Sequence, residues 1–159
     1  MYMYKTEFNH NRQIDLVKEK ISWTGRSEDM YCSSEAIYDL CTSHLKMNLM
    51  TEECVICICL DSALHLTGYF TVASGTVNIC PVTPREIFIK ALMSGSVGIV
   101  LVHNHPSGIS SPSETDVLLT QRVVKSGEII GITVWDHMII GDGQYYSFRE
   151  QSPEILEVA

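Results

Sequence analysis

The sequence contains no hydrophobic run long enough to cross a membrane. Its longest apolar segments, residues 54–60 and 97–102, are far shorter than the about 20 residues that a spanning helix needs. The first residues, MYMYKTEFNHNRQ, also lack an apolar core followed by a small-residue cleavage site, so no secretory signal is predicted there. We therefore expect a cytoplasmic protein that does not enter a membrane.

Positive charge is scarce as well. The chain has 11 Lys and Arg residues against 19 Asp and Glu, which gives a net charge of −8. Nucleic-acid affinity comes largely from basic side chains that displace counterions from phosphates. A broad DNA- or RNA-binding surface is therefore not expected, although partner proteins could bring this chain to nucleic acid. Charged residues make up only 19% of the chain, below the roughly 25% of typical soluble domains.

The cysteines do not form the pattern of a disulfide framework. Six are present, but Cys54, Cys57 and Cys59 lie inside one apolar run instead of being spread through loops. In a strand Cys54 and Cys57 face opposite sides, so this run forms no four-thiolate metal shell by itself. The pattern favours buried thiols in a reducing compartment.

The sequence does contain enough apolar material for one packed domain, with 45% hydrophobic residues in 159. Residues 1–30 have few regularly spaced apolar side chains and are predicted to be an amino-terminal arm, with a short helix over residues 14–21. Residues 31–150 are predicted to form the folded domain, and residues 151–159 a carboxy-terminal tail.

Periodicity within residues 31–150 predicts an α/β (α+β) fold, a central mixed β-sheet flanked by helices. Helices are expected over residues 34–45, 84–93 and 113–126, the last one ended by Gly127. Strands are expected over residues 54–60, 66–73, 97–103, 132–140 and 145–148. The continuous apolar run over 97–103 is typical of a central strand buried on both faces.

Polar side chains that can bind a metal follow this central strand directly. His103 and His105 alternate along the strand end, so their side chains are expected on one face, about 7 Å apart at Cα. Asp116 lies eleven positions after His105, at the start of the next expected helix, and the intervening loop can bring it back over the strand end. Two imidazoles and a carboxylate with a free fourth position are the ligand set of a catalytic zinc site.

Each of these residues also has an ordinary structural explanation. A lone histidine is usually a hydrogen-bonded polar residue, Asp116 suits the first turn of a helix because of the helix dipole, and Ser113 is an ordinary N-cap. Only their joint spacing favours a metal site.

The segment 103–116, HNHPSGISSPSETD, closely resembles the RadC-like branch of the JAB/MPN, or JAMM, metallopeptidase-like superfamily. That branch has His-x-His-Pro followed by Ser-x-x-Asp, with the Asp eleven positions after the second His. The resemblance covers about residues 33–150 and includes Pro84-Arg85-Glu86 and Asp136-His137. It implies the JAB/MPN, cytidine-deaminase-like architecture. It also implies the short, stand-alone form, because full-length RadC proteins carry an additional helix-hairpin-helix region at the amino end.

The resemblance further implies an activity and the residues that carry it. The activity is zinc-dependent hydrolysis of a peptide or isopeptide bond in a peptide or protein substrate. Glu53, just before the strand at 54–60, is implied as general base and then acid, with Glu52 as second choice because it points to the opposite face. Ser113 is implied to stabilise the oxyanion. The implied Zn²⁺ ligands are His103, His105 and Asp116.

A second interpretation comes from a different functional class. Some members of this superfamily are inactive scaffolds, so the chain could be a metal-stabilised, non-hydrolytic binding module that associates with DNA-processing partners. The adjacent letters His-Asn-His do not indicate an HNH nuclease, whose three residues are far apart in a ββα element. Asp136 and His137 are predicted to lie either beside the metal site or on a hairpin surface. Arg85 is predicted to be a solvated side chain or an anion contact.

Overall fold

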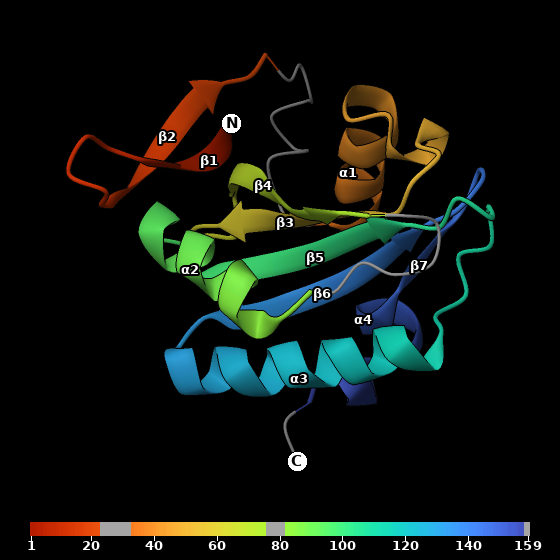
Figure 1. Cartoon of the computed structure of the whole chain (residues 1–159). Coiled ribbons are helices and arrows are strands. Elements are labelled where there is room, and N and C mark those ends of the chain that lie inside the picture. Colours follow the sequence, from red (N-terminus) through yellow and green to blue (C-terminus); the bar gives the residue numbers. More distant parts are fainter. Residues whose placement is uncertain (23–32, 76–81, 158–159) are drawn as a thin grey trace.

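The computed structural model describes residues 1–22, 33–75 and 82–157 and is built on one mixed sheet (Figure 1). Its seven strands follow the order β2-β1-β4-β3-β5-β6-β7. Two neighbouring pairs, β1 with β4 and β5 with β6, run parallel, and the other pairs run antiparallel. The bounds are β1 Tyr2–Phe8, β2 Ile14–Lys20, β3 Cys54–Leu60, β4 Leu66–Ser74, β5 Gly98–Asn104, β6 Thr133–Ile140 and β7 Tyr145–Ser147. The predicted mixed sheet is confirmed.

Helices cover both faces of the sheet (Figure 1). One face carries α1 (Ser34–Asp39), which continues as a π-helical turn over Leu40–His44 and a 3₁₀ turn over Met47–Leu49. The other face carries α2 (Pro84–Ser94) and α3 (Glu114–Ile130). After β7 come the short α4 (Phe148–Gln151) and a 3₁₀ turn over Pro153–Ile155. Among the described residues, no helix combines the length and apolarity that a membrane span requires.

The central strand β5 is buried along its whole length. Ile99 and Leu101 pack into the cluster beneath α2 and α3, whereas Val100 and Val102 pack into the cluster beneath α1. The same alternation directs the next side chain, His103, toward the α3 face. Burial of β5 on both faces therefore decides which helix the histidine meets.

The amino-terminal segment differs from the prediction. Residues 14–21 were expected to include a short helix, but Ile14–Lys20 is strand β2, which pairs antiparallel with β1 along its whole length. Strand β1 then joins β4, with Tyr2 opposite Gly68. The ring of Tyr4 is buried against Gly68, where a Cβ would come within 2.5 Å of it. This segment forms strands because of pairing partners that no local periodicity shows.

Two further boundaries were predicted incorrectly. Gly127 does not end α3; it lies inside the helix, and Gly131, with φ 79°, forms the C-cap. The last strand was expected to include Phe148, but β7 stops at Ser147, whose side chain caps α4. In both cases the decisive contact lies outside the segment, because Gly127 and Phe148 are buried against other elements.

Candidate metal centre

The structure brings His103, His105 and Asp116 together at the carboxyl end of β5. The two histidine Nε2 atoms lie 2.9 Å apart. Asp116 Oδ1 is 3.3 Å from Nε2 of His103, and Asp116 Oδ2 is 3.6 Å from Nε2 of His105. Three candidate ligand atoms, one from each residue, all lie within 4.8 Å of one another. The expected convergence of the strand end and the helix start is therefore present.

Asp116 is held in place by the first turn of α3. Ser113 is the N-cap of that helix, and its Oγ accepts a hydrogen bond from the backbone N–H of Asp116 at 3.2 Å. In return Asp116 Oδ2 accepts from the backbone N–H of Ser113 at 2.7 Å and from its hydroxyl at 2.6 Å. This capping box uses Oδ2 twice and leaves Oδ1 for His103. It also means that the Ser113 hydroxyl already donates to Asp116 and must rotate before it can donate to any other group.

The hydrogen bonds of His105 define its tautomer. Its Nδ1 lies 2.7 Å from the backbone oxygen of Ile109. A carbonyl oxygen can only accept, so Nδ1 carries the hydrogen, and the Nε2 of the neutral ring presents a lone pair to the site. The backbone N–H of His105 donates to Ile140 O at 2.9 Å, which ties the end of β5 to the end of β6.

The electrostatics of the site favour a cation. Burial raises the pKa of Asp116, but hydrogen bonds with His103, His105 and Ser113 outweigh this and hold the pKa well below its usual range. The hydrogen bond with Asp116 raises the pKa of His105, against the effect of burial and with smaller contributions from Ile109 O and the charge of Glu53. An ionised carboxylate beside two imidazoles thus draws positive charge to this point.

The donor set is also compact enough to hold one metal ion, and zinc gives a reference distance. Two ligand atoms on a tetrahedral zinc with bonds of about 2.0–2.1 Å are about 3.3 Å apart. The two histidine Nε2 atoms are 2.9 Å apart and Asp116 Oδ1 is 3.3 Å from Nε2 of His103. One ligand atom from each of the three residues lies within 4.8 Å of the other two, which is compact enough for one ion. His103 is only 4% exposed, so its ring is held by packing. Two histidines and one aspartate leave a fourth position free for another ligand.

The register of the sheet directs Glu53 toward the face that carries this site. Val55 of β3 pairs with His103 of β5. The same antiparallel register, continued beyond the first residue of β3 and the last residue of β5, would set Glu53 opposite His105. Opposite residues in such a pair share a face. The effect of the Glu53 charge on the pKa of His105 agrees with that placement. Glu52 alternates to the other face, and its carbonyl accepts from Asn104 Nδ2 at 3.0 Å.

His137 belongs to the site, which was one of the two predicted alternatives. It comes from β6, is fully buried, and places Nε2 2.9 Å from Nδ1 of His103. Its Nδ1 lies 2.6 Å from Thr120 Oγ1. Burial lowers the pKa of His137 well below its usual value, and the neighbouring His103 lowers it further. Thr120, four residues after Asp116 on α3, was not predicted, although that spacing marks the same helix face.

Asp136 and Arg85 have different surroundings. Asp136 is buried and accepts hydrogen bonds from the hydroxyl of Ser147 and from the backbone N–H groups of His137 and Arg149. It therefore joins β6 to the turn between β7 and α4. Arg85 is exposed on α2, which agrees with a solvated side chain.

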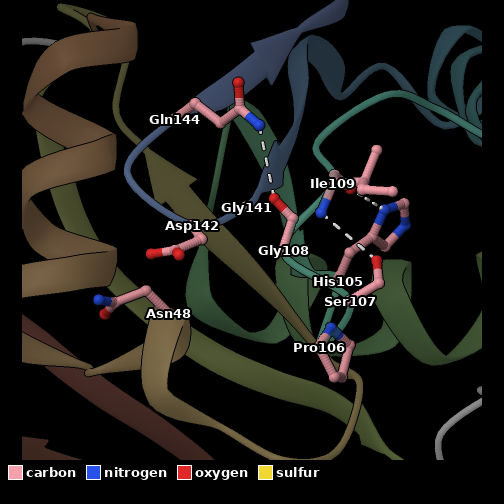
Figure 2. Close-up of a pocket in the computed structure, with 9 residues that line it drawn as sticks. All are labelled: Asn48, His105, Pro106, Ser107, Gly108, Ile109, Gly141, Asp142 and Gln144. Atoms are coloured by element: carbon pink, nitrogen blue, oxygen red, sulfur yellow. Dashed lines mark hydrogen bonds between the residues drawn. The ribbon is translucent and has the colours of Figure 1, made fainter.

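A cavity of about 560 Å³ opens beside His105 (Figure 2). Gly141 lies against the Gly108 carbonyl, where a Cβ would come within 2.5 Å. That carbonyl accepts from the backbone N–H of Asp142 at 2.9 Å. The lining is mainly polar, which suits an extended polar chain better than an apolar ligand. The lining residues are Asn48, His105, Pro106, Ser107, Gly108, Ile109, Gly141, Asp142 and Gln144.

The structure has a mixed sheet with helices on both faces. It places the His-x-His pair at a strand end, against an aspartate in the next helix. This is the arrangement of a JAB-type domain. The RadC-like JAB domain matches residues 31–153. The chain therefore belongs to the RadC-like JAB family.

Two similar curated proteins are both named UPF0758 protein. A UPF0758 protein of Methanosarcina barkeri is 39% identical over 120 residues, which cover 76% of this chain and 52% of that protein. A UPF0758 protein of Thermotoga maritima is 35% identical over 141 residues, which cover 89% of this chain and 58% of that protein. The chain thus spans about half the length of the curated relatives it matches.

Proposed function

We propose that this domain is a zinc-dependent hydrolase of the JAMM type that cleaves a peptide or isopeptide bond in a peptide or protein substrate. The observation that carries the proposal is the open donor set of His103, His105 and Asp116 beside a polar cavity, with Glu53 on the same side. The wider JAB/MPN superfamily, which this chain resembles, includes metallopeptidases, and the donor set has the chemistry expected of an active member.

A Zn²⁺ ion held by these three residues would acidify a water molecule and polarise a scissile carbonyl. The Glu53 carboxylate takes the proton of the attacking water and returns it to the leaving amine. The hydroxyl of Ser113, once turned from Asp116, donates to the oxygen of the tetrahedral intermediate. The cavity beside His105 holds the chain that flanks the scissile bond.

The chain should work in a reducing compartment, which we propose is the cytoplasm. Cys57 and Cys59 are fully buried in β3, and Cys41 is fully buried in the π-helical turn that continues α1. Burial raises the pKa of Cys41 and of Cys57, which keeps both as inert thiols.

The test combines metal analysis with matched glutamate variants. Protein purified without chelator is expected to contain about one zinc per chain and to cleave members of a peptide library or a ubiquitin-like conjugate. Glu53→Gln is expected to retain the zinc and to lose cleavage, because it keeps the side-chain shape but cannot take a proton. Glu52→Gln, on the opposite face of the same strand end, is the control and should retain both.

The opposite outcome is equally definite. Protein that binds no zinc would overturn the metal site and the hydrolase with it. Protein that binds zinc but cleaves nothing, while it binds duplex DNA tightly and in a salt-sensitive way, would overturn the hydrolase and favour the metal-stabilised, non-hydrolytic module.

A further inference from the structure

We propose that Thr120 and His137 are positioning residues, which together set the tautomer of His103 so that its Nε2 lone pair points to the metal position. The inference rests on the metal site of the proposed function. It is carried by a continuous chain of short hydrogen bonds that runs from α3 through β6 to β5. The direction of each bond follows from which atoms can donate.

The chain begins at the hydroxyl of Thr120. Its Oγ1 donates to the backbone oxygen of Asp116 at 2.6 Å. A carbonyl oxygen only accepts, and two oxygens this close need a hydrogen between them. The single hydrogen of the hydroxyl is therefore used in this bond. Thr120 Oγ1 can only accept from its second neighbour, His137 Nδ1, at 2.6 Å.

His137 continues the same donor–acceptor order from α3 to β5. Its Nδ1 must carry a hydrogen in order to donate to Thr120. The ring is fully buried and stacks on Phe148, with centroids 5.3 Å apart. A ring in these surroundings stays neutral and has only one hydrogen. Its Nε2 is thus a lone-pair acceptor.

His103 completes the chain. Its Nδ1 lies 2.9 Å from Nε2 of His137 and must donate there. The hydrogen of the neutral ring is then on Nδ1, and the lone pair is on Nε2, which lies 2.9 Å from Nε2 of His105 and 3.3 Å from Asp116 Oδ1. Acceptor atoms this close to one another need a metal ion or a proton between them. His105 reaches the same tautomer directly, through the backbone oxygen of Ile109. One ligand is therefore oriented by the main chain and the other by two side chains from different elements.

Removal of the Thr120 hydroxyl should reverse the direction of these hydrogen bonds. Without an acceptor at Nδ1, His137 is better off with its hydrogen on Nε2, because a buried N–H with no partner is costly. That hydrogen then points to His103 Nδ1, and His103 must carry its own on Nε2, 3.3 Å from Asp116 Oδ1. A protonated Nε2 cannot bind a metal until the hydrogen is moved.

The direct test reads the tautomers in metal-free protein. Histidine labelled with ¹⁵N distinguishes a protonated from an unprotonated ring nitrogen by NMR, at mildly alkaline pH where the rings are neutral. In the unaltered chain, His103 and His137 are expected to carry hydrogen on Nδ1. In Thr120→Val both are expected to carry it on Nε2, and in Thr120→Ser, which keeps a hydroxyl, on Nδ1. A hydrogen on Nε2 of His103 in the unaltered chain overturns the proposal without any variant.

Zinc affinity, measured by competition with a chromophoric chelator, is the second readout. Thr120→Val is expected to weaken binding by about 10–100-fold, the usual effect of losing an outer hydrogen-bond partner of a metal ligand, and Thr120→Ser is expected to restore it. Thr42→Val is the matched control, since Thr42 makes the same bond to a carbonyl four residues back, that of Tyr38 at 2.8 Å, away from these histidines. It should change neither readout.

The two proposals fail in different ways. Unchanged tautomers and unchanged zinc affinity in Thr120→Val would refute the positioning role and leave the metal site intact. If the unaltered chain binds no zinc, the proposed function fails, and the tautomers of the metal-free protein still decide whether the chain of hydrogen bonds orients His103.

Discussion

Gly127 offers a sharp test of how tightly α3 is packed against the sheet. A glycine inside a helix normally costs about 1 kcal/mol relative to alanine, so Gly127→Ala would stabilise a helix with free space around it. At Gly127, however, a Cβ would lie 2.5 Å from the backbone oxygen of Ile132 and 3.2 Å from side-chain atoms of Phe88 and Val134. To reach the 3.4 Å of ordinary contact, α3 must move by about 0.9 Å.

The expected magnitude follows from these contacts. Overpacking of this kind costs about 1–3 kcal/mol. The shift also strains the bond from the N–H of Ile132 to Gly127 O, 2.9 Å long, which contributes about 1 kcal/mol. After subtraction of the about 1 kcal/mol gained in helix propensity, Gly127→Ala should lower the free energy of unfolding by about 1–3 kcal/mol.

The same shift should reach the metal site. Asp116 lies eleven residues earlier on α3, about 16 Å along the helix axis, and a rigid helix carries it away from the two histidines. Gly127→Ala is therefore expected to weaken zinc binding, whereas Gly131→Ala is not. Gly131 has φ 79°, and a Cβ added there would meet no atom within 4 Å. Its replacement should cost only the about 1–2 kcal/mol of a left-handed backbone.

Urea unfolding and zinc titration of both variants give the answer. If Gly127→Ala is as stable as the unaltered chain or more so, the close approach between α3 and Ile132 is not rigid. If it is destabilised but binds zinc normally, α3 does not move as one body, and the link from packing to the site is refuted.

Three further predictions concern the site and its support. Zinc at about 100 times its Kd should raise the free energy of unfolding by about 2.7 kcal/mol, and Asp116→Ala should abolish this gain; an equal gain in both proteins would place the metal elsewhere. Asn104→Ala should lower the free energy of unfolding by about 1–3 kcal/mol and reduce cleavage with zinc retained. The reason is that Asn104 accepts from the N–H of Cys54 at 2.8 Å and holds the strand end that carries Glu53. Unchanged turnover would show that these hydrogen bonds do not position the base. Burial raises the pKa of Asp136, so its contribution to stability is present below the unfolded pKa of about 4 and is lost as pH rises through the folded pKa. The urea midpoint of the unaltered chain relative to that of Asp136→Asn should therefore fall as pH rises above about 4, and a difference independent of pH would contradict this.

The helices and strands of the core were predictable because their signals are local. The apolar run of β3 and the N-cap at Ser33 lie within the segments they define, and β3 begins and ends as expected. The three metal-binding candidates were also accessible, since strand alternation and the start of the next helix place them from spacing alone. Their donor atoms then come close together because the end of β5 meets the start of α3, the next helix along the sequence.

The failures concern residues whose role depends on a distant segment. Residues 14–20 became a strand because β1 pairs with them and then with β4. Gly127 resembled a helix stop, but its lack of a side chain is used for close packing on Ile132 and Phe88.

What the sequence alone determined is the identity and spacing of the donors and the apolar pattern of the central strands, because both are written within single segments. Only the tertiary structure decided that β6 lies parallel beside β5, so that His137 comes behind His103 and meets Thr120 from α3. The physical reason is that a hydrogen-bond chain across three elements depends on sheet order and helix placement. These are set by the summed packing of the whole domain and not by any one stretch of residues.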